Sequence, residues 1–144
     1  MAQERFSWIA FTQRGAALME TLRSALGGEA TFSRQETNFS LPRWTEARFS
    51  QREALFFVGA VGIAVRAVAP FVKSKATDPA VVVVDEAGRF VIPLLSGHLG
   101  GANALAKEVA ALCGGIAVIT TATDLNARFA VDLWAKRQGL AVLQ

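Results

Sequence analysis

The segment LLSGHLGGAN, residues 94–103, places the single histidine of the chain among glycines, between a predicted strand and a predicted helix. An imidazole can take up and release a proton near neutral pH, so His98 is a candidate general acid or base. Glycines let the backbone approach a ligand closely, and the N–H groups at a helix start favour anions. A structural interpretation is equally open: Ser96 caps the helix, and the glycines let it pack tightly against a sheet.

The segment GAVGIAVR, Gly59–Arg66, comes at the end of a predicted buried strand. Ligands of open α/β sheets bind at the carboxyl ends of the strands, so this loop is a candidate binding loop. Its G-x-x-G spacing lacks the full G-x-G-x-x-G fingerprint and is weak support for a nucleotide site. Arg66 could bind a ligand carboxylate through two hydrogen bonds, or it could lie exposed on a helix.

Two further polar segments lie in predicted loops. Lys73 and Lys75, in the sequence KSKATD, could attract an acidic ligand, although a solvated loop is the more common situation. The sequence TTATD, residues 120–124, follows another buried strand, and its hydroxyls and carboxylate could orient water or bind a polar ligand. Alternatively, Thr123 or Asp124 caps the next helix.

Asp85 and Glu86 follow a run of four valines. A carboxylate pair at a strand end could carry out acid–base chemistry, but Glu86-Ala87-Gly88 is also an ordinary hairpin turn, and the turn is favoured. Cys113 ends an apolar helix face and is interpreted as a packing residue. The sequence contains no P-loop, no G-x-S-x-G and no H-E-x-x-H motif.

The 144 residues include 15 Lys and Arg against 12 Asp and Glu, a formal net charge of +3. With 52% hydrophobic and 19% charged residues, the chain has ample material for a core, which excludes disorder as a description of the whole. One cysteine and one histidine supply neither an internal disulfide nor a four-ligand zinc site. No signal peptide and no apolar stretch of roughly 20 residues is present, so we expect a cytoplasmic protein with no membrane partner.

The isoelectric point near 9.6 raises the question of nucleic-acid binding. The basic residues are dispersed along the sequence, with no interleaved aromatic stacking motif, so we expect no nucleic-acid partner. A mild positive excess suits an anionic small molecule equally well.

Strands and helices alternate along the chain. Apolar runs predict strands over residues 5–12, 29–33, 54–61, 80–85, 89–93, 116–120 and 140–143. Helical spacing predicts helices over residues 15–26, 63–72, 97–112 and 128–138, and a short helix within residues 35–53. This order predicts an α/β fold of three layers: a mostly parallel sheet with helices on both faces and one β-hairpin. The length predicts a single domain over residues 1–144.

Two stretches carry a resemblance to a known family: VGAVGIAVRAVAPFVKSKATDPAVVVVDEAGRFVIPLLSGHLGGANALAKEVAAL, residues 58–112, and VITTATDLNARFAVD, residues 118–132. Together they resemble the N-terminal domain of CbiG, the cobalt-precorrin-5A hydrolase family of anaerobic cobalamin biosynthesis. The resemblance extends over about residues 55–132. Residues 1–34 fit the opening β-α-β unit of the family more loosely, and residues 35–53 match little.

The resemblance implies hydrolytic opening of the δ-lactone of cobalt-precorrin-5A, with release of acetaldehyde and formation of cobalt-precorrin-5B. The cobalt belongs to the substrate, so neither a protein metal site nor another cofactor is expected. Lactone opening needs an activated water and donors to the developing oxyanion. We assign water activation to His98 or to a carboxylate near it, Asp85 or Asp124.

The implied substrate is a large macrocycle fringed with acetate and propionate groups, which suits a basic chain. Backbone N–H groups around residues 97–101 would donate to the oxyanion or to these carboxylates. The predicted substrate-binding residues are Gly59, Gly62, Arg66, Lys73, Lys75, Ser96, Gly97, Gly100, Gly101, Asn103, Thr120 and Thr121.

Members of the family usually continue into a middle segment and a C-terminal domain, which are absent from this sequence. We therefore expect either a function shared with a separate C-terminal CbiG-like chain or a stand-alone N-terminal domain. The alternative to an enzyme is a non-catalytic corrinoid-binding domain or subunit, and a nucleotide-binding α/β protein is a third hypothesis. Apolar surface that the other domains would cover could also lead to a homo-oligomer.

Overall fold

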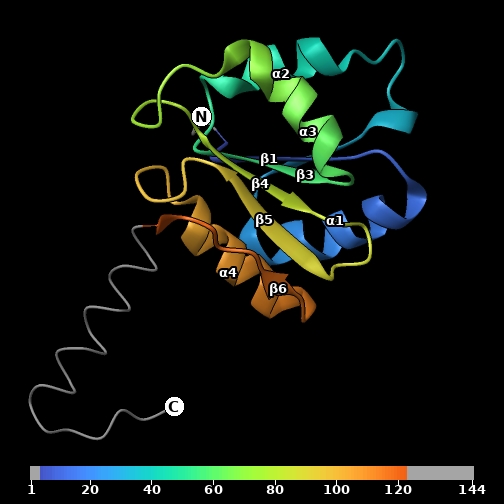
Figure 1. Ribbon diagram of the computed structural model, residues 1–144. Helices are drawn as coiled ribbons and strands as arrows, with labels where there is room; N and C mark the ends of the chain where they lie inside the picture. The colour runs from blue at the N-terminus through green and yellow to red at the C-terminus, as the bar shows by residue number, and fades with distance from the viewer. Residues whose placement is uncertain (1–3, 123–144) are drawn as a thin grey trace, which may run out of the picture.

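The computed structural model describes residues 4–122 (Figure 1). The strands are β1 (Phe6–Ala10), β2 (Glu29–Phe32), β3 (Ala54–Val58), β4 (Ala80–Val84), β5 (Phe90–Leu95) and β6 (Ile116–Ala117). The helices are α1 (Gln13–Leu26), α2 (Leu41–Phe49), α3 (Val61–Val68) and α4 (Ala102–Cys113), with short 3₁₀ turns at Ser33–Gln35 and Ala69–Phe71. The helix and strand predicted over residues 128–138 and 140–143 lie outside the described residues, as does Asp124.

The described strands form one sheet with the order β2-β1-β3-β4-β5-β6. Strands β1 to β4 are mutually parallel, β5 runs antiparallel to β4, and β6 runs parallel to β5. The α/β class, the mostly parallel sheet and the hairpin between β4 and β5 are confirmed. Strands β3 and β4 consist of apolar runs and are buried along their whole length, because these central strands are covered on both faces.

Helices cover both faces of the sheet, with α1 and α4 on one face and α2 and α3 on the other (Figure 1). Successive strand residues alternate between the two cores, because side chains of a strand point to opposite faces. Phe56 and Val82 pack with α1 and α4, whereas Phe57 and Val83 pack with α2 and α3. No helix within residues 4–122 is both long enough and apolar enough to cross a membrane.

The start of α1 follows its sequence signal. Thr12 has extended backbone and its side-chain oxygen accepts a hydrogen bond from the Gly15 N–H at 3.0 Å, so Thr12 caps the helix. The predicted helix over 63–72 instead begins at Val61 and ends at Val68, where the chain tightens into the 3₁₀ turn that contains Pro70.

The start of α4 differs from its sequence prediction. Residues 97–101 form a loop rather than the first turn of the helix, and Gly101 has the left-handed φ of +83° that ends this loop. Strand β6 is also shorter than predicted, ending at Ala117, although the Val118 N–H still donates to the carbonyl of Val91 at 2.8 Å. The chain after β6 therefore continues alongside β5.

The direction of β5 determines where the loops gather. Val84 at the end of β4 pairs with Val91 near the start of β5, and Val81 near the start of β4 pairs with Leu95 at the end of β5. The ends of β5 and β6 consequently lie beside the starts of β1, β3 and β4. We call this side of the sheet the amino edge, and the side where β1, β3 and β4 end the carboxyl edge.

Candidate active site

A pocket of about 590 Å³ opens at the amino edge, beside the loop that joins β5 to α4. Its polar lining includes His98, Lys75 and Thr121, and its apolar wall includes Leu94 and Leu99. The complete lining is Lys75, Pro93, Leu94, Leu95, Ser96, Gly97, His98, Leu99, Thr120, Thr121 and Ala122. The structure thus brings together candidates from three loops that are separated in sequence, together with apolar residues that the sequence analysis did not assign to a site.

The loop between β5 and α4 is tightly built around Ser96. Ser96 has a left-handed φ of +61°, and its hydroxyl donates to the carbonyl of Asp78 at 3.2 Å. A Cβ on Gly100 would lie only 2.4 Å from the Ser96 Cβ, so this position accommodates glycine alone without a backbone shift. A residue other than glycine adopts a strained backbone conformation mainly where the surrounding structure enforces it. The loop that carries His98 therefore has a defined shape.

The first N–H groups of α4 are bound by the loop itself. The Ala102 N–H donates to the Ser96 carbonyl at 3.1 Å, and the Gly101 N–H donates to the His98 carbonyl at 3.2 Å. The predicted capping role of Ser96 is therefore performed by its carbonyl rather than by its side chain. The amides at residues 101 and 102 are engaged within the protein, which reduces the set of donors available to an anion.

Lys73 and Lys75 lie on one closed loop between α3 and β4. The Asp78 carboxylate accepts hydrogen bonds from the Lys73 N–H at 2.9 Å and the Ser74 N–H at 3.1 Å, which closes the loop. Lys75 lines the pocket with His98, whereas Lys73 lines a neighbouring hollow of about 340 Å³ with Phe49. Lys75 therefore places a positive charge at the His98 pocket, whereas the hollow beside Lys73 is also lined by Glu46 and Asp78.

Asn103, a predicted substrate-binding residue, lies outside the pocket lining. Its residue surface is only 5% exposed, and its Nδ2 donates to the Thr121 Oγ1 at 3.0 Å. Gly100 and Gly101 are likewise beside the pocket rather than among its lining residues. These three residues shape the loop that carries His98.

The remaining described candidates lie at the opposite, carboxyl edge. Gly59 and Gly62 follow β3, and the Arg66 guanidinium lies over Gly62, on the exposed side of α3. Asp85 follows β4, and the length of that strand separates it from the His98 loop by roughly 15 Å. The hypothesis that Asp85 lies near His98 is wrong, because β5 returns antiparallel and carries His98 to the other edge.

Asp85 has a structural role in the hairpin. Its Oδ1 accepts a hydrogen bond from the Arg89 N–H at 2.7 Å, and its carbonyl accepts from the Gly88 N–H at 2.9 Å. The turn interpretation is therefore confirmed. Cys113 packs beneath the same turn, with its Sγ 3.2 Å from the Gly88 carbonyl, as expected of a packing residue.

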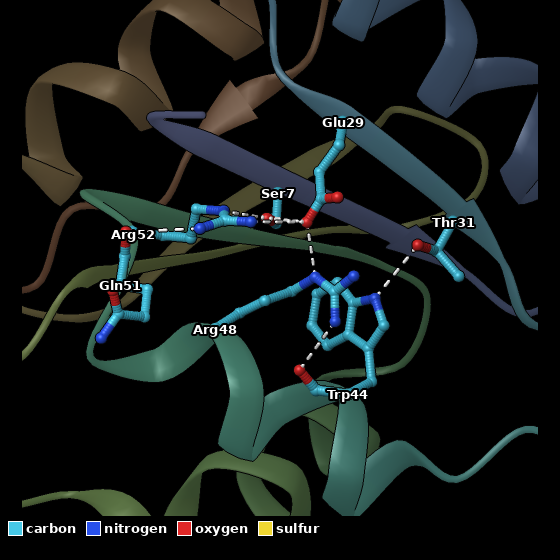
Figure 2. Close-up of polar contacts among 7 residues, drawn as sticks. All are labelled: Ser7, Glu29, Thr31, Trp44, Arg48, Gln51 and Arg52. Atoms are coloured by element: carbon cyan, nitrogen blue, oxygen red, sulfur yellow. Dashed lines mark hydrogen bonds and ion pairs between the residues drawn. The ribbon is translucent and has the colours of Figure 1, made fainter. Parts of the chain in front are cut away.

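A second polar cluster lies at the amino edge, on the face covered by α2 (Figure 2). One carboxylate oxygen of Glu29 accepts hydrogen bonds from Ser7 at 2.6 Å, Arg48 at 2.5 Å and Arg52 at 3.2 Å. Burial alone would raise the pKa of Glu29, but the hydrogen bonds from Arg48 and Ser7 outweigh it and lower that pKa. These hydrogen bonds hold α2 against β1 and β2. No local sequence pattern indicates this cluster, because the three residues bound to Glu29 lie 19 to 23 positions from it and follow no motif.

The chain is similar in sequence and in structure to known proteins. The family described as "Cobalamin synthesis G N-terminal" matches residues 43–124, more than half of the chain. This chain belongs to that family. The match includes most of α2, in a region where the sequence shows little resemblance, and every described residue of the His98 pocket. The recognition of the CbiG N-terminal family from sequence is confirmed.

Curated relatives and a solved structure agree with this family. The chain is 58% identical over 87 residues to the cobalt-precorrin-5A hydrolase of Salmonella typhimurium, and 50% identical over 91 residues to that of Priestia megaterium. These matches cover 60% and 63% of the chain but only 25% and 24% of the relatives. A cobalamin biosynthesis protein G homologue from Sulfolobus solfataricus has a similar structure, with a TM-score of 0.65 and 28% identity. That likeness covers 80% of this chain and 36% of the homologue, so the chain spans a minor part of each full-length protein.

Proposed function

We propose that this CbiG N-terminal chain opens the δ-lactone of cobalt-precorrin-5A by hydrolysis, with release of acetaldehyde. The observation that carries the proposal is the identity of 50–58% to two cobalt-precorrin-5A hydrolases. The pocket at the amino edge supports it, because the pocket combines a histidine, hydroxyl groups, a lysine and an apolar wall. The substrate is anionic, the cobalt is part of it, and the chain carries a formal charge of +3.

In this proposal His98 activates water. Its imidazole takes a proton from a water molecule, the resulting hydroxide adds to the lactone carbonyl, and the ring C–O bond breaks to give a carboxylate and an alcohol. Transfer of the alcohol proton to a second base, the role predicted for Asp124, then permits cleavage of the carbon–carbon bond; acetaldehyde leaves, and the carbon left behind takes up a proton. His98 is suited to return the first proton in that step. Asp85 takes no part, because it lies at the carboxyl edge, while Asp124 remains a predicted second acid–base group.

Binding in this proposal combines charge with apolar contact. Lys75 in the pocket and Lys73 in the adjacent hollow would each bind a peripheral carboxylate of the macrocycle. Leu94 and Leu99 would contact the apolar ring, and the strongly exposed Leu99 is the more accessible of the two. The donors to the oxyanion would be Thr120 or Thr121 and the loop amides before residue 101, since the later amides are bound internally.

The assembly and location follow from the same proposal. The chain spans about a quarter of its curated relatives, so a separate CbiG-like chain that supplies the remaining part is a proposed partner. A reducing cytoplasm is the proposed location, because the chain has a single cysteine, packed beneath a turn.

The proposal is tested by incubating the chain with cobalt-precorrin-5A in H₂¹⁸O under anaerobic conditions. We expect a ring-opened product whose new carboxylate carries one ¹⁸O atom, together with free acetaldehyde. A corrinoid that binds without gaining ¹⁸O would instead support the non-catalytic binding domain. If the chain neither binds the corrinoid nor converts it, both the proposed hydrolysis and the alternative of a non-catalytic binding domain are contradicted.

A further inference from the structure

Asn103 is a polar residue on the buried face of α4. Its neighbours on this face, such as Ala102, Ala106 and Val109, are apolar and fully buried. A buried amide is costly unless it forms hydrogen bonds, so a side chain with only 5% residue exposure at this position calls for a specific contact. That contact lies in the wall of the pocket.

Asn103 joins two segments that both line the pocket. Its Nδ2 donates to the Thr121 Oγ1 at 3.0 Å, and its backbone N–H donates to the Gly97 carbonyl at 3.0 Å. The packing is close as well: a Cβ on Gly97 would lie 2.9 Å from the Asn103 Oδ1 and 3.1 Å from the Thr121 Cγ2. The loop before His98, the first turn of α4 and the segment after β6 therefore meet at this one side chain.

We propose that Asn103 is a positioning residue, which fixes the His98 loop relative to Thr121 without contacting the substrate. This inference rests on the proposed function for its catalytic consequence. Residue 97 precedes His98 directly, so a shift of its carbonyl moves the imidazole relative to the Thr121 hydroxyl. A misplacement of about 1 Å can lower a rate by roughly 10²-fold, whereas the binding contacts of Lys75 and Leu99 would be unchanged.

Three variants separate positioning from general stability. Asn103→Leu removes the side-chain hydrogen bond to Thr121 with a side chain of similar size, and we expect kcat to fall by about 10²-fold with KM changed by less than about threefold. Asn103→Asp keeps the shape, and the Thr121 hydroxyl can donate to the new carboxylate, so kcat should recover to within about fivefold of the original chain. Val109→Ala is the matched control, because it removes buried volume from the same helix away from the pocket.

Amide hydrogen exchange provides a readout that does not depend on turnover. We expect faster exchange at residues 97–100 and 121 in Asn103→Leu than in Val109→Ala, when the two variants are compared at equal global stability. Equal exchange in the two variants would overturn the positioning role, as would a kcat for Asn103→Leu no lower than that of Val109→Ala. A rise in KM that accounts for the whole loss of kcat/KM would also overturn it, because such a change indicates direct substrate binding. If the original chain shows no turnover, the proposed reaction fails, while the exchange measurement still decides the role of Asn103.

Discussion

The residues around His98 determine its position in the pocket. Ser96 accepts a left-handed backbone, Gly100 leaves room for the Ser96 side chain, and Asn103 ties the loop to Thr121. The imidazole is thereby presented beside hydroxyls and Lys75, on a loop whose backbone amides are partly bound to its own carbonyls. This arrangement suits the proposed role of His98 as a general base in opening the δ-lactone.

Replacing His98 tests the general base. His98→Gln retains a polar side chain of similar length but cannot take up a proton at neutral pH. We expect kcat to fall by about 10²–10⁴-fold, the range typical of losing a general acid–base group, with the Kd for the corrinoid unchanged. Turnover can be followed as acetaldehyde release and binding as the change in corrinoid absorbance. A kcat within about twofold of the original would remove His98 from the mechanism.

Lys75 and Arg66 allow the two edges of the sheet to be compared as corrinoid-binding sites. Lys75 is a cation at the amino edge, and Arg66 is a cation at the carboxyl edge. Lys75→Ala removes a charge from the pocket, and we expect the Kd for the corrinoid to rise by about two- to fivefold, less so at high salt. Arg66→Ala removes a charge at the carboxyl edge, where it lies over Gly62, and should leave the Kd unchanged. Absorbance titrations at low and high ionic strength compare the two. The reverse result would place the corrinoid at the carboxyl edge, as the sequence prediction for Arg66 suggests.

Two loops between secondary-structure elements bring the residues of the pocket together. The antiparallel return of β5 carries the His98 loop to the amino edge, and the closed loop that ends at Asp78 brings Lys75 to the same pocket. The Ser96 hydroxyl joins these two loops through the Asp78 carbonyl. On the other face, the Glu29 cluster holds α2 against β1 and β2.

Gly100→Ala tests how closely the loop is packed. The new Cβ would lie 2.4 Å from the Ser96 Cβ, so the backbone must shift, and we expect a loss of about 1–3 kcal/mol in the free energy of unfolding together with reduced turnover. Gly114→Ala is the control: its Cβ meets nothing within 4 Å, although its φ of +72° imposes a local backbone cost. Urea denaturation measures both. Equal turnover in the two variants would show that the loop tolerates displacement.

Glu29→Gln tests the cluster that fastens α2. The loss of the shared carboxylate leaves Arg48 and Arg52 without their charge partner, and we expect a loss of about 1–3 kcal/mol in the free energy of unfolding at pH 7. The hydrogen bonds lower the pKa of Glu29 in the folded protein, despite its burial. A lowered folded pKa contributes stability above the unfolded value of about 4.3, and this contribution is lost as the pH falls through the folded pKa.

The two proteins should therefore differ most in stability at neutral pH and converge in acid. Urea denaturation of the original chain and of Glu29→Gln between pH 7 and pH 3 measures this difference. A gap that stays constant over the whole range would show that the carboxylate charge is not the source of the stability.

The sequence allowed most elements to be predicted, because their signals are local. Thr12 identifies the start of α1, and the valines of β4 identify a strand buried on both faces. The hairpin of β4 and β5 was predicted too, but its consequence for the site was not: reversing β5 separates His98 from Asp85. The start of α4 was misplaced because glycines suit a helix terminus and a tight loop equally well. The Glu29 cluster depends on contacts between distant segments, which no local pattern specifies.

Residues 4–122 form three layers, a sheet with helices on both faces, and carry different loops at the two edges of the sheet. Its amino edge gathers His98, both lysines and two adjacent hollows, whereas its carboxyl edge gathers the hairpin turn and the glycines after β3. The family match over residues 43–124 includes the whole described lining of the His98 pocket. Because the chain spans about a quarter of its curated relatives, the central question is whether this part alone catalyses the reaction.

The most direct measurement is acetaldehyde release from cobalt-precorrin-5A by this purified chain alone, under anaerobic conditions, with His98→Gln in parallel. We expect the original chain to release acetaldehyde at a catalytic rate. We expect His98→Gln to bind the corrinoid without releasing acetaldehyde. Binding without release by the original chain would contradict the assignment of a complete active site to the amino edge, and would indicate that catalysis needs a further chain.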